Sequence, residues 1–147
     1  IPRLADGSLT MKNTAHESLK AVVGIAALLH VPATVNGAAI DTLGFEEALV
    51  VVNSGLSTAT GTADITVQES DASGSGFAAI TGAAFTQIVA ANDVTIYTGR
   101  LNLRNRKRYI RVVLVVGTDN SSLGVEVILL AARDQPVSQV NTNAFSV

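Results

Sequence analysis

The chain has 147 residues, with 10 Lys or Arg against 12 Asp or Glu, and its formal net charge of -2 gives no general reason to bind polyanions. The length fits one domain, and an apolar content of 48% with only 15% charged residues excludes disorder over most of the chain. Because there is no cysteine, disulfides, thiolate nucleophiles and thiolate metal sites are excluded.

An apolar stretch covers residues 21–31, which is too short to span a bilayer as a helix. Asp6 and Glu17 in the polar residues before it argue against a secretory signal. From about residue 34 to residue 133, short β-branched and aliphatic runs are separated by Gly, Asn, Asp and Ser, a rhythm that predicts an all-β domain. Early in this region, Asn36-Gly37 tolerates positive φ at both central turn positions and predicts a tight hairpin.

Two strands are expected in the first half of this region. Residues 45–53 contain the aliphatic run ALVVV, which predicts a buried strand. Residues 63–69 alternate, with Ile65 and Val67 on one face, and this pattern suits an antiparallel strand with one side in solvent. Residues 71–76, DASGSG, are then expected to form a loop.

The second half of the chain has the strongest strand patterns. Residues 106–116 and 123–132 carry unbroken Val, Ile and Leu runs, and the polar residues 117–122 between them predict a central hairpin. Shorter strands are expected at residues 77–80, 85–89 and 94–101. In all, about eight short strands at intervals of ~8–12 residues predict a jelly roll or two-sheet antiparallel β-sandwich.

The two ends of the chain differ from its middle. Both ends are polar and irregular, and only the middle carries the apolar pattern that a core needs. The sequence therefore predicts an N-terminal arm over residues 1–18, a β-sandwich domain over residues 19–133 and a C-terminal arm over residues 134–147.

Charge is segregated along the sequence. No Lys or Arg lies between Ala21 and Gly99, whereas residues 100–111 contain six of the ten basic residues. If this basic cluster is a strand, Arg106 and Arg108 share one face and Lys107 the other, so a continuous nucleic-acid groove is not favoured. The cluster is expected to form ion pairs, either with the chain's own acidic segment or with carboxylates of a protein partner.

Catalytic and metal sites find little support. His16 and His30 are fourteen residues apart and have no cysteine partners, so no metal site is predicted. Residues 74–79 match the dinucleotide fingerprint formally, but no helix pattern follows to aim its N-terminus at a phosphate. No recognisable nucleophile turn flanks either histidine. The sequence therefore predicts a protein that is not an enzyme and binds no cofactor, nucleic acid or membrane.

Three segments carry a resemblance to a known family. Residues 41–53, DTLGFEEALVVVN, are followed by residues 65–71, ITVQESD, and later by residues 99–111, GRLNLRNRKRYIR, with Phe85 and Asn92-Asp93 between the second and third. Together these segments resemble the small capsid cement, or decoration, proteins of tailed bacteriophages. The similarity covers about residues 41–132.

The resemblance implies a dimeric jelly-roll protein that sits on the outside of a phage head and braces neighbouring major capsid protein subunits. The candidate capsid contacts are four residues of the basic cluster and three of the C-terminal arm: Arg104, Arg106, Lys107, Arg108, Pro136, Val137 and Phe145. The alternative is a β-sandwich carbohydrate-binding or adhesion module, which needs an aromatic platform. An exposed cluster of Tyr97 and Tyr109 would favour that alternative.

Overall fold

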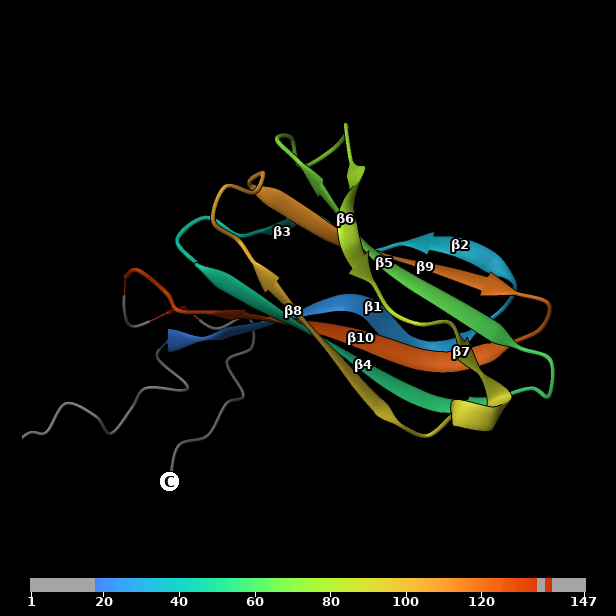
Figure 1. Ribbon diagram of the computed structural model, residues 1–147. Helices are drawn as coiled ribbons and strands as arrows, with labels where there is room; N and C mark the ends of the chain where they lie inside the picture. Colours follow the sequence, from blue (N-terminus) through green and yellow to red (C-terminus); the bar gives the residue numbers. More distant parts are fainter. Residues whose placement is uncertain (1–17, 135–136, 139–147) are drawn as a thin grey trace, which may run out of the picture.

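Two antiparallel sheets face each other in the computed structural model, which describes residues 18–134, 137 and 138 (Figure 1). The four-stranded sheet has the order β1 (Lys20–His30), β10 (Ser121–Leu130), β4 (Glu47–Ser57) and β8 (Ile96–Asn102). The six-stranded sheet has the order β2 (Ala33–Asn36), β9 (Tyr109–Gly117), β5 (Thr62–Ser70) and β6 (Ala78–Ala84), with β3 (Ile40–Asp41) on β9 and β7 (Ile88–Val89) on β5.

Helical structure is almost absent from the described part of the chain, where one 3-10 turn, η1 (Ala90–Asn92), precedes β8. No helix there has the length and apolar character needed to cross a membrane. The strands alone therefore determine the architecture.

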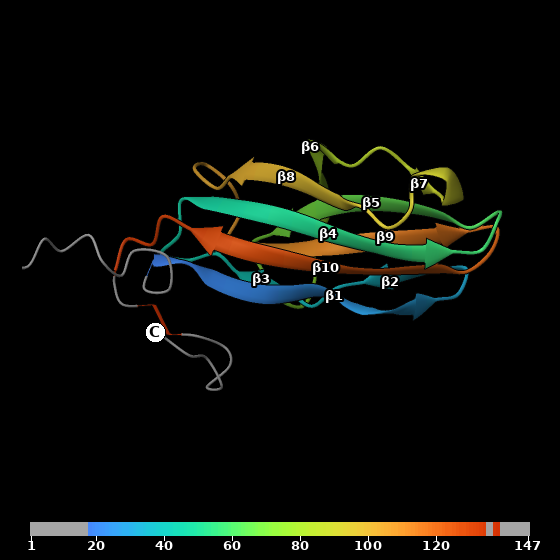
Figure 2. The ribbon, with the colours of Figure 1, turned by 90° about the horizontal axis from the view of Figure 1, so that it is seen from below.

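The strand order is that of a jelly roll. Strands β2 and β3 follow one another along the same edge of β9, and β6 and β7 do so along β5. With each pair counted as one interrupted strand, the ten labelled strands reduce to eight, ordered 1-8-3-6 in one sheet and 2-7-4-5 in the other. Each sheet thus mixes early and late strands, as two Greek keys require. The predicted all-β jelly-roll sandwich is confirmed (Figure 2).

The core lies between the sheets and follows the two-residue period of the strands. In β5, Ile65 and Val67 are 1% and 3% exposed, so the predicted shared face is confirmed as a core face. Strand β4 begins two residues later and ends four residues beyond the predicted 45–53, and it buries one face rather than both. The largest fully buried apolar side chains come mainly from the central strands: Ile65, Ile88, Ile110, Leu114, Leu129, Val50, Val52, Val112, Val125 and Val127.

The predicted central hairpin is wrong. Strand β9 pairs with β2, β3 and β5 in one sheet, whereas β10 pairs with β1 and β4 in the other. The polar residues 118–120 therefore carry the chain from one sheet to the other. Turn residues indicate where the chain reverses, but they do not determine whether it stays in the same sheet.

The hairpin predicted at Asn36-Gly37 is also wrong, because the strands on either side of it both pair with β9. Gly37 instead donates its N–H to the Val112 carbonyl at 2.8 Å. A Cβ on Gly37 would lie 2.1 Å from the carbonyl oxygen of Gly24 in β1. Glycine is needed here because the two sheets touch backbone to backbone along this side of the sandwich.

The apolar stretch over residues 21–31 is an edge strand, β1, that the sequence pattern did not predict. Its pairing with β10 shifts register between Val23 and Ile25 and again between Ile25 and Leu28, so its apolar residues do not alternate cleanly. Strand pairing begins at Lys20, and most of both predicted arms lies outside the described residues, so the arm boundaries stay predictions.

Candidate functional site

The four predicted contact cations lie in the loop that connects β8 to β9. Leu103 accepts a hydrogen bond from the Arg106 N–H at 3.2 Å, and Asn105 between them has a φ of 62°. Strand β9 begins only at Tyr109, so the expected alternation of Arg106 and Arg108 against Lys107 on two strand faces is wrong. Because this segment is a turn with a residue in the left-handed region rather than a strand, its side chains do not alternate between two faces.

Glu46 receives two of the guanidinium groups at this end of the sandwich. The Nε atoms of Arg104 and Arg133 lie 2.6 Å from its Oε2 and Oε1. These hydrogen bonds, first Arg104 and then Arg133, hold the pKa of the Glu46 carboxyl below its usual value. Glu46 thereby joins the β8–β9 loop to the segment that follows β10.

Asp41 on β3 is held by a forked contact. The Nε and Nη2 atoms of Arg108 lie 3.0 and 2.8 Å from its two carboxylate oxygens. This contact lowers the pKa of Asp41, and the same contact raises that of Arg108. The guanidinium of Arg108 also lies 5.2 Å from the ring centre of Tyr109.

Three further pairs complete the charged end. Lys107 Nζ lies 3.3 Å from an Asp71 carboxylate oxygen, and Arg106 Nη1 lies 3.5 Å from Glu69. Arg100 on β8 pairs with Glu47 on β4, and this contact raises the pKa of Arg100. We call this set of ion pairs the charged end; it comprises Arg100, Arg104, Arg106, Lys107, Arg108, Arg133, Asp41, Glu46, Glu47, Glu69 and Asp71.

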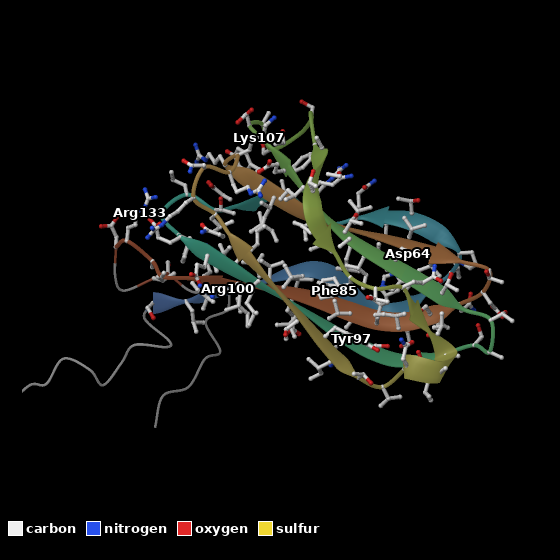
Figure 3. The ribbon with its side chains drawn as sticks, in the orientation of Figure 1. Asp64, Phe85, Tyr97, Arg100, Lys107 and Arg133 are labelled. Carbon is white, nitrogen blue, oxygen red and sulfur yellow. The ribbon has the colours of Figure 1, made fainter. Side chains whose placement is uncertain are left out.

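The charged end brings together segments that are far apart in the sequence. Of the two expected kinds of ion pair, those with the chain's own acidic segment are present, and contacts with a partner stay a prediction. The arginine and lysine side chains remain between 36% and 72% exposed, so solvent screens these pairs and each contributes little to stability. Figure 3 shows Lys107, Arg100 and Arg133 toward one end of the molecule and Asp64 toward the other.

The remaining predicted residues are dispersed or undescribed. Val137 is half-buried, whereas Pro136, Phe145 and His16 lie outside the described residues. His30 is buried, with its Nε2 3.0 Å from the Ala26 carbonyl oxygen. Within residues 18–134, 137 and 138, no group of His, Asp and Glu is placed to hold a metal ion.

Neither the dinucleotide pattern nor the tyrosine pair forms a site. Residues 71–76 are a loop that leads into strand β6, so no helix N-terminus points at this turn. Tyr97 lies on β8 in the four-stranded sheet, whereas Tyr109 lies on β9 in the other, and both are half-buried. The two rings therefore do not form a shared sugar-stacking platform.

The outer surface of the four-stranded sheet carries aliphatic side chains among polar ones, since the register also places Arg100 beside Leu49, Thr98 beside Val51 and Asn53 beside Ile96. Leu49 and Val51 alternate with the buried residues of β4, and the register places Val51 beside Glu126 and Glu126 beside Val23. Val23 and Ile96 are 61% and 63% exposed. We call this surface the outer face; its apolar residues are Val23, Leu49, Val51, Ile96, Ile128 and Leu130.

A carboxylate with no cation beside it lies within this outer face. Glu126 is exposed on β10, and none of the ion pairs between described residues includes it. The other sheet presents hydrogen-bonded polar side chains to solvent, Arg111 to Gln68 at 2.8 Å and Gln87 to Asp64 at 2.9 Å, whereas the four-stranded sheet has the Arg100 to Glu47 pair beside its aliphatic residues. The two outer surfaces of the sandwich thus differ in chemistry.

The sequence did carry a signal for the outer face. Residues 48–52 and 127–130 are apolar at successive positions, whereas a strand with one solvated side alternates. For residues 45–53 the run predicts a buried strand. In the structure each strand buries one face in the core and leaves the other half-exposed. An apolar run at the surface of a two-layer fold is typical of an interface.

No family model and no curated protein matches this chain. Among solved structures, the PBSX exported protein XepA has a TM-score of 0.54 and 18% identity, over 86% of this chain and 42% of that one. The VP2 protein of the infectious bursal disease virus subviral particle also has a TM-score of 0.54, with 10% identity, over 92% of this chain and 38% of that one. The chain spans about two-fifths of either protein, and at these identities the likeness shows the fold alone.

Proposed function

We propose that this chain is a structural virion protein that binds the outer surface of a bacteriophage head and cements neighbouring major capsid protein subunits. The observation that carries the proposal is the outer face, whose aliphatic side chains include Val23 and Ile96, each more than half exposed. Soluble monomers rarely expose contiguous apolar patches beyond a few hundred Å2, and larger ones mark interaction sites. The jelly-roll likeness to VP2 and the resemblance to cement proteins agree with this role.

Cementing needs only preferential binding to the assembled shell. A protein that binds the shell but not its separated subunits stabilises the shell by mass action, by ~2.7 kcal/mol at a free concentration one hundred times its Kd. This requires no catalytic group. The proposed contact is therefore a permanent apolar one, with charge setting its orientation.

The charged end is the proposed orienting element. Each guanidinium carries five N–H donors, and the carboxylate of Glu46 or Asp41 takes up only some of them. The remaining donors of Arg104, Arg106 and Arg108, with the ammonium of Lys107, would bind carboxylates of the major capsid protein. Pro136, Val137 and Phe145 remain the proposed contacts of the C-terminal arm.

Co-sedimentation with empty, expanded heads tests the proposal. The full chain should bind saturably, and Ile96→Lys should weaken binding about tenfold, because it replaces burial of a largely exposed aliphatic side chain with a desolvated charge. Val115→Lys is the matched control, since Val115 is 41% exposed on the other sheet. Failure of the full chain to sediment with heads, or equal binding by both variants, would contradict the proposal.

A second set of variants tests the basic loop. Replacing Arg104, Arg106, Lys107 and Arg108 by Gln should weaken head binding, while the unfolding midpoint stays close to that of the parent. Neutral residues are preferable to acidic ones, because a carboxylate at any of these positions would face one of the chain's own. Unchanged binding would remove the loop from the interface.

Two parts of the proposal need separate measurements. The homodimer is a prediction from the resemblance, and sedimentation equilibrium of the purified chain tests it. The carbohydrate-binding or adhesion alternative has no aromatic platform to favour it in the described residues, since Tyr97 and Tyr109 lie on different sheets. A glycan array is the next experiment if heads are not bound.

A further inference from the structure

The sandwich is open on the side opposite the Gly24–Gly37 contact. Strands β6 and β8 are the edge strands there, and each pairs with only one neighbour among the described residues. Between them lies a cavity of about 140 Å3. Its lining consists of Val50, Val67, Gly82, Ala83, Ala84, Phe85, Thr98, Gly99, Arg100 and Leu101.

The floor of this cavity is the hydrophobic core itself. Val50 and Val67, from facing sheets, are only 2% and 3% exposed. Two glycines leave space at the sides of the cavity. A Cβ on Gly82 would meet no atom within 4 Å, and the Phe85 ring packs over Gly99, 3.0 Å from where a Cβ would be. Phe85 and Arg100 are the large side chains among the lining residues, and Figure 3 labels both.

The volume limits what the cavity can hold. Cofactors and drug-sized ligands need ~300–1,000 Å3, whereas an apolar cavity of ~150 Å3 accommodates benzene. At about 140 Å3, this cavity fits one aliphatic or aromatic side chain. A side chain delivered by an extended segment could also hydrogen-bond to the free edge of β8.

The rim of the cavity carries two arginines with donors left over for a carboxylate. Arg100 lines both this cavity and an adjoining hollow that Arg106 also lines, and no Asp or Glu is among the described lining residues of either. Arg100 donates to both carboxylate oxygens of Glu47 through Nε and Nη2, but this contact uses two of its five N–H donors and the side chain is 72% exposed. The Arg106 contact with Glu69 is long, at 3.5 Å. Side chains two positions apart on an extended segment share one side, ~6.6–6.8 Å apart. The matching motif is an apolar residue with a carboxylate two positions away.

Of the N-terminal residues 1–17 and the C-terminal residues 135–147, only the first segment contains a large apolar residue two positions from an Asp or Glu. Residues 135–147 contain no Asp or Glu. Residues 1–17 contain Leu4-Ala5-Asp6, in which a leucine precedes an aspartate by two positions. Leu4 matches the cavity in size, and Asp6 matches Arg100 and Arg106 in charge.

The N-terminal segment can reach this site within one molecule. The registers place Lys20, Leu129, Ala48 and Leu101 in one row across the four-stranded sheet. Three strand spacings of ~4.8 Å separate the ends of this row, about 14 Å in all. The eleven residues 7–17 span up to ~36–40 Å when extended, enough to pass around the sheet.

We propose that the groove between β6 and β8 is the receptor for this chain's own N-terminal segment, with Leu4 in the cavity and Asp6 on the Arg100 and Arg106 guanidinium groups. Occupation would close the open side of the core. The inference does not depend on the proposed function, because it concerns contacts within one molecule. Head binding and groove occupation can therefore fail independently.

Disulfide trapping in the full chain tests the inference, since the native sequence has no cysteine. Leu4→Cys combined with Ala83→Cys should form an intramolecular disulfide at least roughly tenfold faster than Leu4→Cys combined with Val115→Cys, because docking raises the effective concentration of the pair. Adding Asp6→Asn should slow the reaction with Ala83→Cys. Ala84→Cys replaces Ala83→Cys if the latter lowers the unfolding midpoint.

Each outcome of the trapping experiment is decisive. Fast intramolecular bonding at Ala83 or Ala84, slowed by Asp6→Asn, supports the receptor. Rates equal to that of the Val115 control overturn it. Disulfide-linked dimers in place of the intramolecular product also overturn it, because the occupant then comes from another molecule. Non-reducing gels with the parent chain as reference distinguish these results.

Discussion

Replacing Gly37 by Ala tests the closed side of the sandwich. The new Cβ would lie 2.1 Å from the Gly24 carbonyl oxygen, whereas real Cβ contacts keep at least 3.0 Å, so the two backbones must separate by about 0.9 Å (3.0 minus 2.1). Overpacking of this kind costs ~1–3 kcal/mol. The same movement strains the 2.8 Å hydrogen bond from Gly37 to Val112, worth ~0.5–1.5 kcal/mol. We expect a loss of ~2–4 kcal/mol in the free energy of unfolding.

Urea unfolding followed by circular dichroism measures this loss. Gly74→Ala is the matched control, because a Cβ there meets no atom within 4 Å, and such a change is neutral or stabilising by up to ~1 kcal/mol. At ~2–4 °C per kcal/mol, Gly37→Ala should also lower Tm by roughly 4–16 °C. Equal midpoints for Gly37→Ala and Gly74→Ala would refute the backbone contact between the sheets.

Three further predictions concern stability. Neighbouring guanidinium groups hold the pKa values of Asp41 and Glu46 below the usual ~4, so the stabilisation from these carboxylates is fully present above about pH 5 and is lost as the pH falls through the lowered values. The midpoint of unfolding should fall on acidification, and Asp41→Asn should flatten part of that fall. Leu114→Ala, at a fully buried position, should cost ~2–5 kcal/mol in urea unfolding, and a loss under 1 kcal/mol would contradict its place in the core. Asp93→Ala removes acceptors for the Ser57 N–H at 2.7 Å and hydroxyl at 3.0 Å, and it should cost ~1–3 kcal/mol in the same assay.

The sequence predicted strands better than their connections. Alternation in residues 63–69 predicts the core face of β5 correctly because burial on one side of a strand imposes a two-residue period. The same reasoning cannot assign strands to sheets. Residues 106–116 and 123–132 contain neighbouring strands, yet the jelly roll places them in opposite layers. The dipeptide Asn36-Gly37 is typical of a hairpin turn, but here the glycine is required by a contact with β1. Because β1 belongs to the opposite sheet, the local sequence could not indicate this contact.

The sequence predicted which charged residues form the candidate site, but not how they are arranged. Segregation of charge indicated that the basic cluster would pair with carboxylates, either the chain's own or a partner's, and Arg108 with Asp41 is a pair of the first kind. The sequence could not show that Glu46 takes two arginines, since Arg133 comes from beyond β10. The outer face was missed because an apolar run in a strand looks the same whether its second side meets a core or a partner.

The charged end holds six cations against five carboxylates, whereas Asp64, toward the other end in Figure 3, is in none of the ion pairs between described residues, so the described part of the molecule has a dipole along its length. A negatively charged surface exerts a torque on such a dipole before any atoms touch, over about one Debye length, ~8 Å at physiological ionic strength. Molecules that arrive at the wrong angle are turned during the encounter, which raises the productive fraction of collisions. Added salt should therefore slow association while leaving the lifetime of the bound state nearly unchanged.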